Sequence, residues 1–163
     1  MGNICFFQKS EQQQQHSLSV DQIQLKTSCP DLDECIEFNF QFEDPVWVVK
    51  VYDGDTFTIA KKMGNVWYKF QVRVNGIDCP EIKSKDQNEK RIALQVKEYV
   101  ASMILRKQVI VKNIQKDKYG RLLSDVFIDD INLAQHLLQK HYAVSYDGGT
   151  KMKVDWNTYI NFF

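Results

Sequence analysis

The stretch that decides the fold is residues 46–60, which read VWVVKVYDGDTFTIA. Two runs rich in β-branched and aromatic residues flank Asp53-Gly54, and this dipeptide is typical of tight turns between antiparallel strands. The stretch therefore predicts a β-hairpin. Asp44-Pro45, directly before it, marks the start of the domain to which the hairpin belongs.

Further strand and helix signals follow the hairpin. Three segments rich in β-branched and aromatic residues are expected to be strands: 66–74, 108–114 and 121–128. Helical spacing of apolar residues is found in 86–106, after the capping residue Asn132, and in 156–163. We therefore expect an α+β fold, a five-stranded Greek-key β-barrel of the oligonucleotide-binding (OB) type with two to three helices.

The first 45 residues differ in composition from the rest. Residues 1–45 carry 2 basic and 8 acidic side chains and residues 46–163 carry 19 and 13, so an arm of net charge −6 precedes a domain of net charge +6. Residues 8–19 are rich in Gln and Ser and are expected to be a disordered spacer. Residues 36–42 alternate apolar and polar, which predicts a short amphipathic strand. We therefore divide the chain into a partly disordered acidic arm and a folded domain.

Composition limits the class of protein. The 163 residues, 44% of them hydrophobic, suffice for one compact domain with appendages and are too few for two full-sized domains. The basic excess of the domain favours an anionic substrate or surface, and a solvated surface of unequal charge is the alternative. The four cysteines form no C-x-x-C pair, so we expect free thiols in a reducing compartment.

The N-terminal residues resemble an acylation site. Gly2 follows the initiator Met as in N-myristoylated proteins, with Phe6 where Ser or Thr is usual, and Cys5 offers a position for a second acyl chain. Two chains are needed for stable anchoring. The start lacks the basic leader of a secretory signal. We therefore expect an intracellular protein, either cytoplasmic or attached to a membrane surface through acylation.

Three segments place charged residues beside turns and strand ends: Asp53-Gly54-Asp55-Thr56, residues 73–81 and residues 117–121. Singly, each has a structural explanation as a turn or a strand end. Together they hold carboxylates able to bind a hard cation, two arginines able to grip a phosphate, and a further carboxylate able to act as a base.

The order and spacing of these segments resemble the staphylococcal (thermonuclease) nuclease family over residues 46–146. The resemblance implies calcium-dependent hydrolysis of phosphodiester bonds in DNA and RNA by metal-assisted attack of water. It implies that Asp55 and Asp78 ligate the calcium ion. It also implies that the backbone carbonyl of Cys79, which replaces the usual Thr, is the third ligand and that Asp53 helps to hold the metal site.

The resemblance also implies roles for the remaining charged residues. Arg73 and Arg121 match two phosphate-clamping arginines, and Glu81 matches the carboxylate proposed to position or deprotonate the attacking water. Tyr119 matches a phosphate-contacting tyrosine, and we assign Lys118 beside it to substrate binding.

Two other functions stay open. The first is a non-catalytic nucleic-acid- or protein-binding module on the same fold, since some family members have lost their active-site residues. The chain retains all five central residues, which favours the hydrolase: Asp55, Arg73, Asp78, Glu81 and Arg121. The second is a membrane-attached adaptor, which explains Gly2 and Cys5 but not the three charged segments. A further family tyrosine has no assigned match, because Tyr146 is offset by one residue. We expect a monomer.

Overall fold

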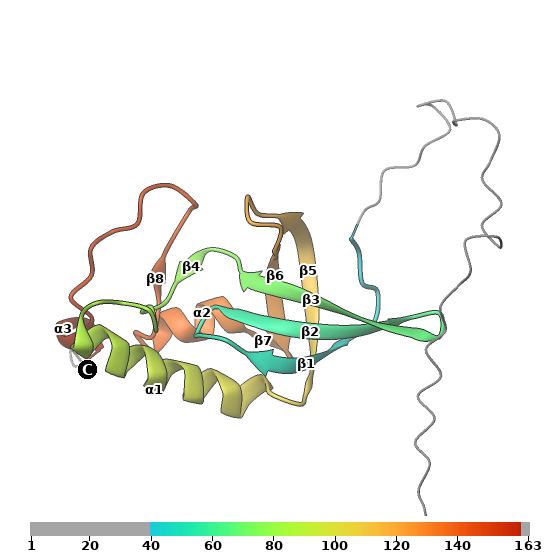
Figure 1. Cartoon of the computed structure of the whole chain (residues 1–163), viewed down its shortest axis with the longest axis horizontal. Helices are drawn as coiled ribbons and strands as arrows, with labels where there is room; N and C mark the ends of the chain where they lie inside the picture. Colours follow the sequence, from blue (N-terminus) through green and yellow to red (C-terminus); the bar gives the residue numbers. More distant parts are fainter. Residues whose placement is uncertain (1–39, 161–163) are drawn as a thin grey trace, which may run out of the picture. The chain divides into compact units, whose positions relative to one another are not determined.

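The predicted hairpin is present and begins a closed β-barrel of five strands (Figure 1). The computed structural model describes residues 40–160. Neighbouring strands pair in the order β3-β2-β1-β5-β6, and β6 pairs in parallel with β3, which closes the barrel. The five strands are β1 (Val46–Val51), β2 (Thr56–Met63), β3 (Val66–Val74), β5 (Gln108–Lys116) and β6 (Leu122–Ile128). The predicted α+β fold with a five-stranded barrel is confirmed.

Three helices and three very short strands complete the part of the chain that the structure describes: α1 (Gln87–Ile104), α2 (Leu133–Gln139), α3 (Trp156–Ile160), β4 (Ile77–Asp78), β7 (Ile131–Asn132) and β8 (Val144–Ser145). Strand β7 extends the sheet beside β6, and β4 pairs with β8 in a separate antiparallel ladder. In Figure 1 this ladder stands at the opposite end of the domain from the β2-β3 turn. None of the helices in residues 40–160 combines the length and apolarity needed to cross a bilayer.

The helices begin where polar side chains cap them. Asn132 accepts a hydrogen bond from the N–H of Gln135 at 3.0 Å, as predicted for the start of α2. Asp86 caps α1 in the same way, with the N–H of Asn88 at 2.8 Å. These caps satisfy backbone donors that the first helical turn leaves unpaired.

Alternating strand residues fill the core of the barrel. Fully buried apolar side chains of the strands include Val48, Phe57, Ile59, Val72 and Val126, all at 0% exposure. Helix α1 adds Ile92, Val96, Val100 and Ile104 to the same core. Burial of each large apolar side chain contributes about 1.5–3 kcal/mol.

The residues before β1 contact the barrel through side chains. The ring centroids of Phe40 and Phe42 lie 5.6 and 5.5 Å from that of Phe70. The backbone of residues 40–42 is irregular, so the predicted strand is wrong there. Packing of the Phe40 and Phe42 rings on Phe70 explains the alternating apolar residues without strand pairing. The rest of that strand, the spacer of residues 8–19 and the acylation candidates Gly2 and Cys5 lie outside the described residues.

Gly54 is required by close packing rather than by the turn itself. Its backbone does not adopt a positive φ, in contrast to Gly76 and Gly120. A Cβ atom at residue 54 would lie 2.7 Å from Cγ1 of Val96 and 2.8 Å from Sγ of Cys79. The Asp-Gly signal therefore predicted the hairpin correctly, but α1 and the segment after β4 are what exclude a side chain.

We expect Gly54→Ala to lower the free energy of unfolding by about 1–3 kcal/mol, because the added methyl group overpacks a buried contact. Urea unfolding measures the change. Gly149→Ala is the matched control, because its Cβ would meet only the side chain of Asp147, at 3.1 Å. An unchanged midpoint for Gly54→Ala would contradict the packing explanation.

Candidate active site

The three charged segments meet in one cleft of about 620 Å³. The β1-β2 turn, the end of β3, the segment after β4, the β5-β6 turn and the segment after β8 all contribute to its walls. Nine residues assigned from the sequence line it: Asp53, Asp55, Arg73, Asp78, Cys79, Glu81, Lys118, Tyr119 and Arg121. The fold therefore brings together every predicted metal, catalytic and substrate residue, and their roles stay predictions.

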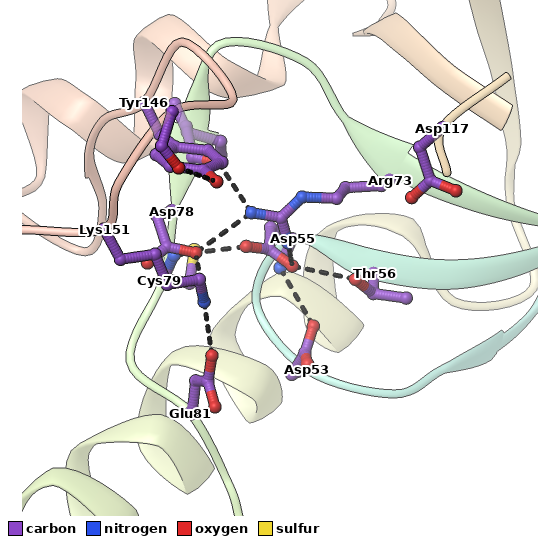
Figure 2. Close-up of polar contacts among 12 residues, drawn as sticks. Asp53, Asp55, Thr56, Arg73, Asp78, Cys79, Glu81, Asp117, Tyr146 and Lys151 are labelled. Atoms are coloured by element: carbon purple, nitrogen blue, oxygen red, sulfur yellow. Dashed lines mark hydrogen bonds and ion pairs between the residues drawn. The ribbon is translucent and has the colours of Figure 1, made fainter. Parts of the chain in front are cut away.

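Arg73 joins the two predicted metal-ligating carboxylates (Figure 2). Its Nη1 lies 2.7 Å from Oδ1 of Asp55, and its Nη2 lies 2.9 Å from Oδ1 of Asp78. The β2-β3 register, which pairs Thr56 with Arg73, places the guanidinium beside Asp55. Both carboxylates are buried, at 3% and 8% exposure, so pairing with a cation offsets a large desolvation cost.

The carboxylate of Asp55 is held from two further directions. The hydroxyl of Thr56 donates to Oδ1 at 2.8 Å, and the backbone N–H of Cys79 donates to Oδ2 at 3.2 Å. Burial, with the negative charges of Asp55, Asp53 and Asp78, raises the pKa of the Cys79 thiol well above its usual range. Without a bound cation the thiol is therefore neutral.

Asp53 supports the turn that carries Asp55. Its Oδ1 accepts a hydrogen bond from the N–H of Asp55 at 3.3 Å. Burial, followed by the charge of Asp55, raises the pKa of Asp53 from 3.8 to about 7. A cation bound by Asp55 would favour the ionised form of Asp53 and would lower this pKa.

Arg121 is oriented by Asp117, to which the sequence analysis assigned no role. Nε of Arg121 lies 2.7 Å from Oδ2 of Asp117, and the N–H groups of Tyr119 and Arg121 donate to Oδ1 at 2.8 and 2.9 Å. Burial opposes ionisation of Asp117, but the hydrogen bonds from Arg121 outweigh it and lower the pKa. The guanidinium lies 5.4 Å from the ring centre of Tyr119. The sequence contained a signal for this role of Asp117, because an Asp at the first position of a turn is a typical hydrogen-bond acceptor for backbone N–H groups of the turn.

Glu81 lies on the segment between β4 and α1, with its side chain 55% exposed. Its backbone N–H donates to Oε1 of Glu89 at 3.1 Å, and the hydroxyl of Ser84 donates to Oε2 of the same residue at 2.6 Å. Glu89, in the first turn of α1, therefore fixes the segment that carries Glu81. Glu89 was not among the residues predicted from the sequence, although its position three residues after the cap Asp86 is a known place for a side chain that binds upstream backbone.

Lys151 is a cleft residue that the sequence analysis did not identify. Its Nζ lies 3.0 Å from Oδ1 of Asp78 and also pairs with Oε1 of Glu81 (Figure 2). Burial lowers the pKa of Lys151, but the hydrogen bonds to Glu81 and Asp78 outweigh it and raise the pKa overall. A charged ammonium group therefore contacts one carboxylate assigned to the metal and the carboxylate assigned to the attacking water.

Tyr146 also belongs to the cleft, although the sequence analysis left it unassigned. Its ring centre lies 5.7 Å from Cζ of Arg73, and its hydroxyl donates to the carbonyl of Gly149 at 2.9 Å. The β4-β8 ladder pairs Ile77 with Ser145 and so brings Tyr146 beside the end of β3. The sequence pattern did not predict this strand pairing, and the pairing is what places Tyr146 in the cleft.

The donor chemistry of the cleft fits a calcium ion. Carboxylate oxygens of Asp55 and Asp78 already converge on the same guanidinium, and such hard oxygens are the ligands that calcium prefers. Within residues 40–160 no group of three or more His, Cys, Asp or Glu side chains is arranged to hold a metal. A calcium ion here would therefore need a backbone carbonyl, water and substrate to complete its ligands.

Comparison with known proteins assigns the family. The family model described as "Staphylococcal nuclease homologue" matches residues 71–159, which is more than half of the chain. The chain belongs to this family. The match covers two of the three charged segments of this chain, including Arg73 and Arg121.

Three relatives show how far the similarity of this staphylococcal nuclease homologue extends. An uncharacterized protein of Methanocaldococcus jannaschii is 29% identical over 65% of this chain and 61% of its own length. A probable endonuclease of Schizosaccharomyces pombe is 26% identical over 63% of this chain and 55% of its own length. An uncharacterized endonuclease of Escherichia coli O157:H7 is 32% identical over 61% of this chain and 60% of its own length. The chain thus spans about 55–61% of the length of these relatives.

Proposed function

We propose that this staphylococcal nuclease homologue is a calcium-dependent nuclease that hydrolyses phosphodiester bonds of DNA and RNA. The observation that carries the proposal is the direct contact of Arg73 with both Asp55 and Asp78, in a cleft that Glu81 and Arg121 also line. Two of the relatives bear the name endonuclease, which points to the same chemistry.

The arginines account for stabilisation of the transition state. A phosphodiester carries one negative charge and gains another as water attacks, so positive charge is needed where the pentacovalent centre develops. Arg73 and Arg121 offer planar guanidinium groups, which form paired charge-assisted bonds to phosphate oxygens and stay protonated. Tyr119 and Lys118, on the β5-β6 turn, bind a neighbouring phosphate. Glu81 accepts a proton from the attacking water or orients it.

The carboxylates at the base of the cleft would hold the metal. Asp55, Asp78 and the backbone carbonyl of Cys79 would be the ligands from the protein, with Asp53 and Thr56 keeping Asp55 in position. Calcium supplies Lewis-acid polarisation of the phosphate and a template for substrate.

Digestion of single-stranded DNA and of RNA, with calcium, with magnesium and with chelator, tests this function. We expect both substrates to be hydrolysed with calcium, hydrolysis to stop with chelator, and Asp55→Asn to be inactive. Equal rates with magnesium would reject the calcium requirement. No hydrolysis under any condition, with nucleic-acid binding retained, would favour the non-catalytic binding module instead.

Lys151 gives a prediction for metal affinity. Its ammonium contacts Asp78 and Glu81 and must release at least part of these contacts when a cation binds Asp78. The lysine side chain is 44% exposed, and exposed ion pairs contribute up to about 1 kcal/mol. We therefore expect Lys151→Met to tighten calcium binding by up to about fivefold, as measured by isothermal titration calorimetry without substrate.

Lys153→Met is the control for Lys151→Met, because Lys153 is an exposed lysine of the same segment. It is expected to leave the dissociation constant for calcium unchanged. Unchanged or weaker calcium binding by Lys151→Met would contradict competition between the ammonium and the metal.

A further inference from the structure

The outer face of β1, β2 and β3 is basic and aromatic. These three strands contain no Asp or Glu, and four of their basic residues face outward: Lys50, Lys62, Lys69 and Arg73. The fifth, Lys61, lies on the other side with Tyr68 and pairs with Asp44. Strand alternation buries Val72 and Val74 and turns the intervening residues of β3 outward. An anionic ligand would therefore meet little repulsion along this face.

The outward residues form rows that begin in the cleft. Gln71 and Arg73 line the cleft, and Lys69 and Trp67 follow on the same side of β3. The β2-β3 register places Ala60 opposite Lys69, and Lys62 opposite Trp67. At roughly 3.3 Å per residue, the row from Arg73 to Trp67 is about 20 Å long. The active-site cleft thus continues into an exposed track along the sheet, which consists of Gln71, Lys69 and Trp67 on β3 with Ala60 and Lys62 on β2.

An apolar hollow lies at the far end of this track. It has a volume of about 470 Å³ and is lined by Trp47, Val48, Val49, Ala60, Trp67 and Arg106. The two tryptophans are 42% and 58% exposed. Two exposed indole rings beside a guanidinium group are unusual on a surface that nothing binds.

The chemistry of the track fits single-stranded nucleic acid. Unpaired bases stack on aromatic rings, with about 1–3 kcal/mol per base, and phosphates pair with lysines. The bases of a duplex are stacked on one another and cannot reach Trp47 and Trp67. The face between the first strands of an OB-type barrel is also a common place for oligonucleotides.

We propose that the outer face of β1-β3 binds single-stranded nucleic acid over several nucleotides. Bases stack on Trp47 and Trp67, phosphates contact Lys62 and Lys69, and the same strand enters the cleft at Arg73. The proposal rests on the proposed function for the direction of the strand toward the cleft. Binding to the track itself requires neither metal nor hydrolysis.

The test is binding of a fluorescent single-stranded 12-mer in chelator, measured by anisotropy. The double variant Trp47→Ala/Trp67→Ala is expected to lose at least about 30-fold in affinity, because each lost stack costs at least about fivefold. Tyr68→Ala is the matched control: this tyrosine is 45% exposed on the same strand, at a position that alternates to the other side, and its substitution is expected to have no effect. Circular dichroism checks that each variant is folded.

Charge reversal provides a second readout that does not depend on the tryptophans. Lys62→Glu/Lys69→Glu should weaken 12-mer binding and reduce the slope of log affinity against log salt by about 1.4, since each phosphate contact on a single strand contributes about 0.7. Substitution of these surface lysines leaves the core unchanged, so this variant tests the track even if the tryptophan variant fails to fold.

The outcomes separate this inference from the proposed function. If the wild-type protein shows no hydrolysis and the tryptophan variant loses affinity for the 12-mer, the nuclease proposal fails and the track stands. If hydrolysis occurs and both double variants bind the 12-mer like the wild type, the track is wrong. A tryptophan variant that changes only the oligomeric state in size-exclusion chromatography would show a face for self-association and would also overturn the inference.

Discussion

Arg73→Lys is expected to lower kcat for single-stranded DNA by about 10²- to 10³-fold, the loss typical when one preorganised donor to a developing oxyanion is removed. Lysine keeps the positive charge but lacks the planar pair of donors that contacts Asp55 and Asp78 at 2.7 and 2.9 Å. The loss should appear in kcat and in kcat/KM together, because the interaction strengthens in the transition state. Steady-state kinetics with calcium measures it.

Two comparisons make the Arg73 experiment decisive. Arg91→Lys is the control, because Arg91 is exposed on α1 and its guanidinium binds Asn157 outside the cleft. Arg73→Ala should in addition destabilise the fold in chelator by about 3–5 kcal/mol, because it leaves the buried carboxylate of Asp55 without its cationic partner, whereas Asp78 keeps Lys151. Calcium should restore part of that stability. Hydrolysis by Arg73→Lys at the wild-type rate would remove the arginine from the mechanism.

Glu81→Gln is expected to lower kcat by about 10²- to 10⁴-fold, with little change in KM, because the amide cannot accept a proton from water. The side chain is 55% exposed and glutamine has the same shape, so the free energy of unfolding should change little. Steady-state kinetics and urea unfolding test these expectations.

Glu98→Gln, an exposed carboxylate on α1, is the matched control for Glu81→Gln and should act like the wild type. Glu89→Gln is informative between these two, since Glu89 holds the backbone of Glu81 at 3.1 Å and has no assigned contact with substrate. It should lower kcat less than Glu81→Gln. A full rate with Glu81→Gln would assign proton transfer to another group.

The strands and helices were largely predictable because the signals that specify them are local. Alternation along 46–74 depends on neighbours within one strand, and the caps Asp86 and Asn132 act within one helical turn. The hairpin was predicted because Asp53-Gly54 is a typical turn dipeptide, whereas the structure requires Gly54 for close packing. Gly54 is needed because Val96, far along the chain, leaves no space for a side chain.

The sequence by itself determined the barrel strands, the three charged segments and the choice of acids and bases that could act on a phosphate. Only the tertiary structure decided that Asp55 and Asp78 share one guanidinium, that Tyr146 reaches the cleft and that Lys151 pairs with Glu81. Such contacts join residues distant in the chain, and they depend on strand register and on the path of the segment after β8. Local backbone preferences do not encode these, because register and path result from the packing of the whole barrel.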